Sequence, residues 1–141
     1  MGMPLVKHRF TLDEYHRMGE AGIFHEDDRV ELIDGEIVEM GPIGRDHSSC
    51  VNRLTALFAP LAGRKASLSI QNPVILAEYH EPQPDLAVLR YRADGYKAGH
   101  PGPADVLLMI EVGDSTVVWD RENKIPLYAR TGIQETWLVN L

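Results

Sequence analysis

The sequence predicts an α/β (α+β) fold, in which helices flank a central mixed β-sheet and an N-terminal helix and β-hairpin precede it. Three observations support this prediction. Helical and strand-like segments alternate along the 141 residues. Residues 106–112 form the most apolar run, which is typical of a strand buried on both faces. No repeat, linker or low-complexity segment interrupts the chain, so we expect a single domain over residues 1–141.

The first two elements carry clear local signals. Thr11 and Glu14 have the spacing of a capping box, which predicts a helix that runs to about Glu20. Apolar, β-branched runs then flank Asp34-Gly35, a pair that tolerates the positive φ of a type I′ turn. Residues 29–40 are therefore predicted to form a β-hairpin.

The middle of the chain combines one helix with several strands. Apolar residues recur at helical spacing between about Asp46 and Leu61, and Pro60 is expected to end or distort that helix. Residues 92–104 are rich in glycine and proline and are predicted to form a loop. Strands are predicted at Ala66–Gln71, Val74–Tyr79 and Pro84–Tyr91.

The last third is predicted to contain a buried strand, a helix and a final strand. The apolar run 106–112 stops at a glycine, and a helix is expected over about Val117–Arg130, kinked or divided by Pro126. Gly132 stands where a glycine commonly follows a helix. Residues 135–141 form the last predicted strand.

The charge composition excludes several classes of protein. The chain has 14 Lys and Arg against 21 Asp and Glu, a net charge of −7, which argues against non-specific coating of nucleic acid. An enzyme that contacts nucleic acid locally remains compatible with this charge. There is no apolar run of about 18 residues for a membrane span and no signal-peptide core. The single cysteine, Cys50, suits a reducing compartment, so we expect a cytoplasmic protein without membrane contact.

Three carboxylates lie in or beside apolar strands. Asp85 opens one strand, Glu111 closes the most apolar one, and Glu31 lies inside the hairpin. A buried carboxylate is costly unless it is paired or binds a cation, and carboxylates that converge at adjacent strand ends suit a hard cation such as Mg²⁺. Each of the three could instead be solvated or paired with an arginine. We expect Glu36 and Glu39 to lie on the solvated side of the hairpin.

Lys124 and His47 are further candidates. Lys124 lies one turn after Asp120 and one turn before Tyr128 on the predicted helix. It either forms a surface pair with Asp120 or reaches the carboxylates, where an ammonium can orient water and offset transition-state charge. A histidine near the start of a helix, such as His47, is most often a local hydrogen-bonding residue. His47 and Tyr128 are secondary candidates for the site, and the histidines lack the spacing of a zinc site.

Five stretches of the chain resemble one known family. They are Arg29–Val38, Gln83–Val88, Ile110–Thr116, Asp120–Ala129 and Gly132–Val139. Their order and spacing resemble the Uma-two family of restriction endonucleases. Pro84-Asp85 and Glu111-Val112-Gly113 resemble the two halves of the PD-(D/E)XK nuclease motif. The resemblance covers about residues 10–141.

The resemblance implies a restriction-endonuclease-like fold and metal-dependent hydrolysis of phosphodiester bonds. It implies that Asp85 and Glu111 are catalytic ligands of Mg²⁺ or Mn²⁺, with Glu31 as an added acidic ligand. The lysine of the motif would fall at Gly113, and the family moves it to the following helix, here Lys124. A DNA substrate and a homodimer are also implied.

Two departures from the family pattern bear on activity. Gly-Asp-Ser-Thr at residues 113–116 replaces the usual Ser-Pro-Ser-Thr and adds a negative charge near the site. The family continues beyond the last strand, so we expect C-terminal strands to be missing. Two alternatives to a metal-dependent DNA endonuclease stay open: an inactive nuclease-fold scaffold for nucleic-acid binding or oligomerisation, and a hydrolase of small phosphodiesters. The candidate phosphate contacts are scattered cations, namely Arg45, Arg53, Arg64, Lys65, Arg90 and Arg92.

Overall fold

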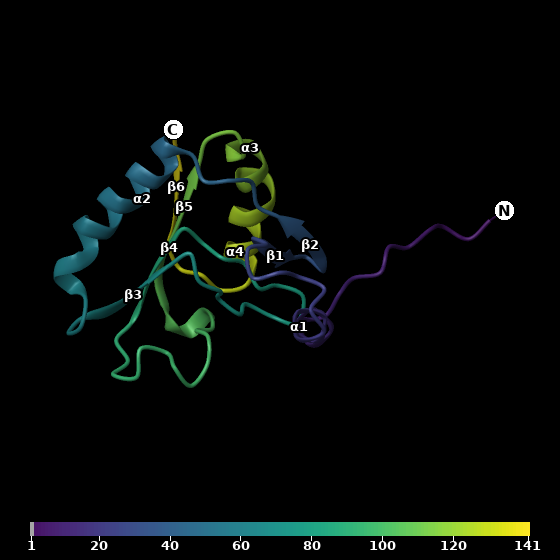
Figure 1. The fold of residues 1–141 in the computed structure, drawn as a ribbon, viewed down its shortest axis with the longest axis horizontal. Helices are drawn as coiled ribbons and strands as arrows, with labels where there is room; N and C mark the ends of the chain where they lie inside the picture. The colour runs from purple at the N-terminus through teal and green to yellow at the C-terminus, as the bar shows by residue number, and fades with distance from the viewer. Residues whose placement is uncertain (1) are drawn as a thin grey trace.

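The computed structural model describes residues 2–141 and has three layers, with a β-sheet between two helical layers (Figure 1). In this four-stranded sheet the first three strands pair antiparallel, whereas the fourth is parallel to its neighbour. This mixed, helix-covered sheet confirms the predicted fold class. The strands lie in the order β3 (Ala66–Ile70), β4 (Leu86–Arg90), β5 (Val106–Gly113) and β6 (Thr136–Asn140).

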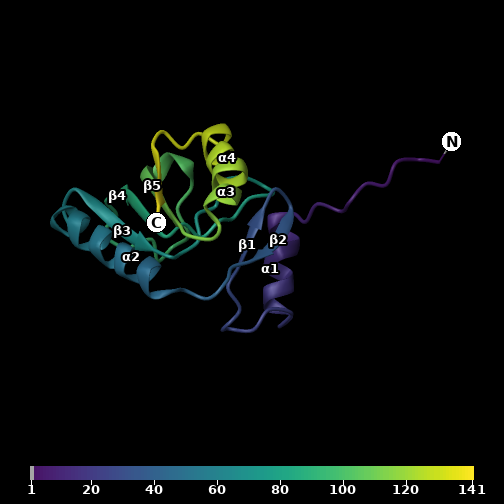
Figure 2. The ribbon, with the colours of Figure 1, turned by 90° about the horizontal axis from the view of Figure 1, so that it is seen from above.

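Helix α2 (Arg45–Phe58) covers one face of the sheet, and a second helical layer covers the other (Figures 1 and 2). The second layer also provides the crossover that the parallel neighbours β5 and β6 need. Its parts are α3 (Val117–Trp119), the π-helical turn η3 (Asp120–Lys124) and α4 (Ile125–Arg130). Two 3-10 turns complete the helical elements: η1 (Ala59–Leu61), which continues α2 through Pro60, and η2 (Pro103–Asp105).

Side chains of β4 and β5 alternate between the two layers because successive residues of a strand point to opposite faces. On β4, Val88 packs in the cluster formed with α2, and its neighbour Ala87 packs in the cluster formed with α4. On β5, Ile110 belongs to the α2 side and Met109 to the α4 side. Glu111 therefore shares the α4 side with Met109.

The N-terminal part of the chain forms a helix and a hairpin beside the α4 layer (Figure 2). Helix α1 (Leu12–Glu20) begins at Thr11 with both hydrogen bonds of the predicted capping box. Strands β1 (Val30–Ile33) and β2 (Glu36–Glu39) form the predicted hairpin as a separate two-stranded sheet. Its Asp34-Gly35 turn has φ angles of 51° and 76°, as a type I′ turn requires.

The predicted strand Val74–Tyr79 is wrong. The segment instead turns back on itself, and Ala77 and His80 form only an isolated bridge. The N–H groups of Val74, Ile75 and Leu76 donate to the carbonyls of Pro82, Pro101 and His80, so their hydrogen bonds go to loop residues and not to one neighbouring strand. Prolines interrupt the segment on both sides, at Pro73, Pro82 and Pro84.

The predicted helix 117–130 is present but divided, in agreement with the expected effect of Pro126. The π-helical turn Asp120–Lys124 ends two residues before this proline. A proline ring clashes with the carbonyl four residues earlier, and a wider turn just upstream relieves that conflict. None of the helices in residues 2–141 combines the length and the apolar content that a membrane crossing needs.

Candidate active site

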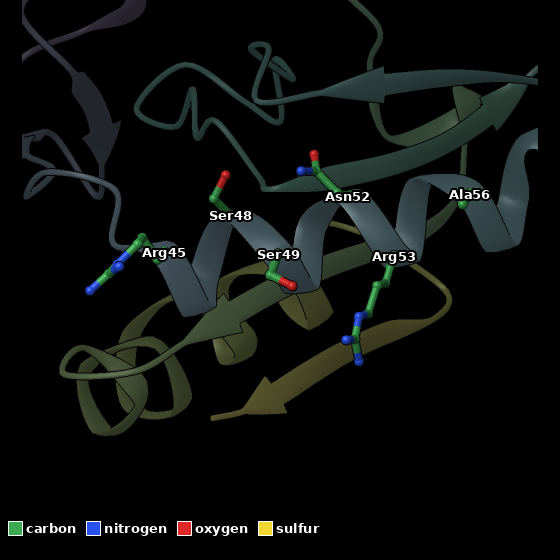
Figure 3. A pocket seen from close by; sticks show the side chains of 6 residues that line it. All are labelled: Arg45, Ser48, Ser49, Asn52, Arg53 and Ala56. Atoms are coloured by element: carbon green, nitrogen blue, oxygen red, sulfur yellow. The ribbon is translucent and has the colours of Figure 1, made fainter.

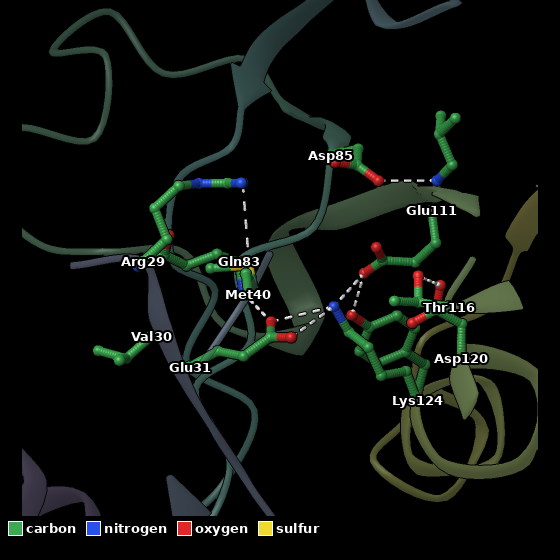
Figure 4. A network of polar contacts seen from close by, with 12 residues as sticks. Arg29, Val30, Glu31, Met40, Gln83, Asp85, Glu111, Thr116, Asp120 and Lys124 are labelled. Carbon is green, nitrogen blue, oxygen red and sulfur yellow. Dashed lines mark hydrogen bonds and ion pairs between the residues drawn. The ribbon is translucent and has the colours of Figure 1, made fainter. Parts of the chain in front are cut away.

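A pocket of about 450 Å³ opens between the hairpin, the start of α2, the start of β4 and the end of β5 (Figure 4). Two cations, Arg29 and Lys124, line it together with six carboxylates. All four residues that the sequence predicts to be catalytic are among these groups. The carboxylates are Glu31, Glu39, Asp85, Glu111, Asp114 and Asp120.

Asp85 and Glu111 reach the pocket because of the register between β4 and β5. Leu86 pairs with Ile110, so the same antiparallel register continued by one residue sets Asp85 opposite Glu111. Directly opposed residues of this kind have Cβ atoms about 4.5–5.5 Å apart and point to the same face. Both residues are nearly buried, with exposed fractions of 7% and 4%. Two carboxylates thus face the same space from neighbouring strands.

Lys124 brings an ammonium to these carboxylates from the helical layer. Its Nζ lies 3.0 Å from Glu31 Oε2 and 2.8 Å from Glu111 Oε1, and only 3% of the residue is exposed. The side chain points into the pocket from the last position of the π-helical turn (Figure 4). Within residues 2–141 Lys124 has no salt bridge to Asp120, which instead accepts a hydrogen bond from Thr116 Oγ1 at 3.2 Å. The buried arrangement replaces the surface pair that was the simpler alternative.

Gly113 explains why the ammonium comes from a helix. This position follows Glu111-Val112 and would carry the lysine of the nuclease motif. A Cβ at Gly113 would lie 2.9 Å from both Cα and Cβ of Val117, closer than side chains approach one another. The tight turn into α3 leaves no room for a lysine here. Lys124 occupies the equivalent space from the facing layer.

Burial shifts the pKa values of the charged groups in the pocket. It raises the pKa of Glu111 to about 8, a shift opposed by the ammonium of Lys124 and reinforced by the two neighbouring carboxylates. Burial disfavours the charged form of Lys124, but Glu111 and Glu31 outweigh it and raise the lysine pKa. Burial and the charge of Glu111 also raise the pKa of Tyr128, whose hydroxyl donates to Glu111 Oε1 at 2.5 Å. Burial is therefore the largest single influence on the pKa of all three groups.

His47 lies at the edge of the pocket and contacts Asp85. Its Nε2 is 3.0 Å from Asp85 Oδ1, and the other carboxylate oxygen accepts a hydrogen bond from the N–H of Val112 at 2.7 Å. Nδ1 of His47 is buried and has no hydrogen-bond partner in the part of the chain that the structure describes. The two secondary candidates, His47 and Tyr128, thus each contact one strand carboxylate.

The donor set fits a hard divalent cation. Mg²⁺ is usually bound through one or two carboxylates and several waters, and Asp85 and Glu111 supply two facing carboxylates. Burial is the main cause of the raised pKa of Glu111, and the charges of Asp85 and Glu31 add to it. Among the described residues, no three or more His, Cys, Asp or Glu side chains are grouped so that they could hold an ion together. Both oxygens of Glu31 accept from Lys124, and its role as a third ligand stays a prediction.

Sequence reasoning missed three groups in the pocket. The backbone N–H of Gln83 donates to Glu31 Oε2 at 2.9 Å, a contact that leaves no side-chain signature. Asp120 is 6% exposed, and Arg29 directs its guanidinium to Gly41 O at 3.0 Å. Asp120 and Arg29 both lie in stretches that carry the family resemblance, and this location is the feature of the sequence that could have identified them.

Two of the expected phosphate contacts lie outside the pocket on the outer face of α2. Arg45 and Arg53 are exposed there, beside a second, open hollow (Figure 3). No carboxylate lines this hollow. The other residues around it are Ser48, Ser49, Asn52 and Ala56.

The remaining expected contacts lie farther along the chain. Arg64 and Lys65 are exposed in the turn between η1 and β3. Arg90 donates to a backbone carbonyl of the segment before β5, and Arg92 forms a salt bridge with Asp94 at 2.8 Å. The structure therefore places two of the six cations on α2 and two in the turn that follows η1, and it binds the other two locally.

Comparison with known proteins identifies the family of this chain. The model of the Uma2 family, described as "Putative restriction endonuclease", matches residues 12–141. The chain belongs to the Uma2 family. Among solved structures, this Uma2 chain is similar to a "putative nuclease belonging to DUF820 from Anabaena variabilis ATCC 29413", with a TM-score of 0.61 and 22% sequence identity. The match covers 93% of the Uma2 chain and 74% of the other, and it shows a shared fold. No curated protein matches the chain.

Proposed function

We propose that this Uma2 protein is a metal-dependent endonuclease that hydrolyses phosphodiester bonds of DNA. One observation carries the proposal: the buried Lys124 contacts the carboxylates of both Glu31 and Glu111, and Asp85 lies opposite Glu111 on the neighbouring strand. A structural ion pair needs only one carboxylate for one ammonium. Phosphodiester hydrolysis needs acidic groups for a metal ion and a charged donor beside them. The family match supports the same chemistry.

Asp85 and Glu111 would hold Mg²⁺ or Mn²⁺ between the two strands. Such an ion, when bound, polarises the scissile phosphate and lowers the pKa of a coordinated water. Lys124 is positioned to orient the attacking water and to offset the charge that develops on the phosphate oxygens. His47 and Tyr128 each contact one of the two carboxylates and restrict its orientation.

The distribution of charge supports a DNA substrate. Residues 45–65 contain four Lys and Arg against a single carboxylate, although the whole chain is acidic. This basic segment starts at the pocket, because Gly44 lines the pocket and Arg45 lines the hollow on α2. A phosphate backbone that follows α2 would therefore pass the acidic site. The cytoplasmic location and the homodimer stay predictions.

The direct test is nicking of supercoiled plasmid by the purified protein in Mg²⁺, in Mn²⁺ and in EDTA. We expect nicking with either ion, none in EDTA, and none with Asp85→Asn or Glu111→Gln, because each variant removes a ligand charge. Glu36→Gln is the matched control, since Glu36 is exposed on the hairpin outside the pocket.

Three outcomes would change the proposal. Nicking by Asp85→Asn at the wild-type rate would exclude the site. Binding of DNA without cleavage in either metal would favour the inactive scaffold. Cleavage of small phosphodiesters but not of plasmid would favour the small-molecule hydrolase.

A further inference from the structure

Glu31 differs from the other acidic residues of the pocket in how its carboxylate is used. Lys124 Nζ donates to both of its oxygens, at 3.1 Å and 3.0 Å, and the N–H of Gln83 donates to Oε2 at 2.9 Å. Glu31 is 2% exposed and Lys124 is 3% exposed. The carboxylate is thus enclosed by donors on the side that faces the lysine (Figure 4).

Glu111 contacts the same lysine in a different way. Its Oε1 accepts from Tyr128 and lies 2.8 Å from Lys124 Nζ. The structure records no hydrogen bond to its Oε2 from any residue in 2–141, which leaves that oxygen available to an ion. Tyr128 and the lysine thus contact a single oxygen of Glu111, whereas donors contact both oxygens of Glu31.

We infer that Glu31 is a positioning residue that holds the ammonium of Lys124, and that it is not a metal ligand. The inference rests on the proposed function, because it assumes that Lys124 acts in phosphodiester hydrolysis. A buried ammonium needs a fixed anion, and Glu111 alone would have to serve the lysine and the metal together. Glu31 supplies that second anion from the hairpin.

The backbone of Gln83 links this lysine anchor to the metal side of the site. Gln83 lies two residues before Asp85, and its N–H fixes Glu31 Oε2. The same short segment therefore sets the position of one metal-facing carboxylate and of the anion that holds the lysine. This arrangement gives the separate hairpin sheet a definite part in the site.

The first test measures metal binding by calorimetric titration of the whole protein with Mn²⁺. Loss of a direct ligand should weaken binding by more than the roughly 10–100-fold that loss of an outer-shell partner costs, and we expect this for Asp85→Asn and Glu111→Gln. We expect Glu31→Gln to leave the Mn²⁺ affinity close to the wild-type value. A loss with Glu31→Gln as large as that with Asp85→Asn would overturn the inference.

The second test is a double-mutant cycle in the plasmid-nicking assay. If Glu31 acts through the lysine, Glu31→Gln should lower kcat by about 10²-fold with little change in KM. The same change should cost almost nothing in a Lys124→Met background, because the group it positions is absent. Equal costs in both backgrounds would overturn the inference. Thermal denaturation of each variant checks that it is folded, and Glu36→Gln serves as the exposed control.

Failure of the inference differs from failure of the proposed function. If the wild-type protein neither binds Mn²⁺ nor nicks DNA, the proposed function fails and the inference fails with it. If the wild type is active and Glu31→Gln loses metal affinity, only the inference fails.

An NMR signal of the Lys124 ammonium that is protected in the wild type and exchanges rapidly in Glu31→Gln would support the pairing directly. Unchanged protection in Glu31→Gln would contradict it.

Discussion

The pocket and the outer face of α2 meet at the start of that helix, yet their physical properties are opposite. The pocket is largely buried, and its six carboxylates outnumber its two cations. The α2 face is exposed, and in the described part of the chain Arg45 and Arg53 form no salt bridge. The net charge of −7 averages these two surfaces and describes neither of them.

The contrast indicates that the two surfaces would contribute differently to activity. Groups in the pocket are fixed by short contacts and by burial, so changes there should alter the rate of chemistry. Exposed cations interact through solvent and are screened by salt, so changes on α2 should alter binding. Separate measurements of kcat and of DNA affinity can therefore distinguish the contributions of the two surfaces.

The largest effect should come from Lys124→Met in the pocket. We expect kcat for plasmid nicking to fall by about 10²–10⁴-fold, because the charged donor beside the carboxylates is lost. DNA affinity, measured by fluorescence anisotropy with Ca²⁺ in place of Mg²⁺, should change little. Lys97→Met in an exposed loop is the control. A folded Lys124→Met protein with wild-type kcat would contradict the assigned role.

The next largest effect concerns the turn at the end of β5. Gly113→Ala adds a methyl group 2.9 Å from the backbone of Val117, and overpacking of this kind costs about 1–3 kcal/mol of unfolding free energy. Urea denaturation measures the change. Gly99→Ala, where the added group meets nothing within 4 Å, should be close to neutral. Equal stabilities of the two variants would show that the turn at residue 113 has more room than the structure indicates.

Local signals in the sequence predict most of the fold. The Thr11 capping box and the Asp34-Gly35 turn each depend on neighbouring residues, and both form as predicted. The error at Val74–Tyr79 has a different origin, because a short apolar run between prolines does not reveal whether strand partners exist. Partners are set by tertiary structure.

The sequence predicts individual residues of the candidate site but not the contacts between them. Asp85 and Glu111 follow from strand patterns and register, since each lies at the end of an apolar run. The contact between Lys124 and Glu31 joins residues 93 positions apart, and no local signal specifies it. The family resemblance suggested that Lys124 belongs to the site. Only the structure shows that Glu31 is bound to it.

A smaller effect is expected from the exposed arginines of α2. The double variant Arg45→Gln/Arg53→Gln should weaken DNA binding several-fold and reduce the slope of log K against log salt by about 2, because each phosphate contact contributes about 0.9. At saturating DNA, kcat should be unchanged. Arg121→Gln, an exposed arginine on η3, is the control. An unchanged salt slope in the double variant would remove α2 from the DNA-binding surface.

A last effect is a dependence of stability on pH that arises at Glu111 in the pocket. Burial raises the pKa of Glu111 from an ordinary value of 4.5 to about 8, so the folded protein binds this proton more tightly than the unfolded chain does. The stability linked to this proton is complete below the unfolded pKa and is lost as the pH rises through 8. In EDTA, the Tm of the wild type should therefore decrease between about pH 5 and about pH 9.

Glu111→Gln should flatten this decrease because glutamine does not titrate, whereas Arg53→Gln on α2 should keep it. Added Mg²⁺ should raise the Tm more at the alkaline end of the range, since the ion and the proton compete for the same carboxylate. If Glu111→Gln retains the wild-type slope, another group titrates on unfolding, and the charge excess of the pocket is not centred on Glu111. The pH experiment thus tests the buried groups of the pocket without a measurement of activity.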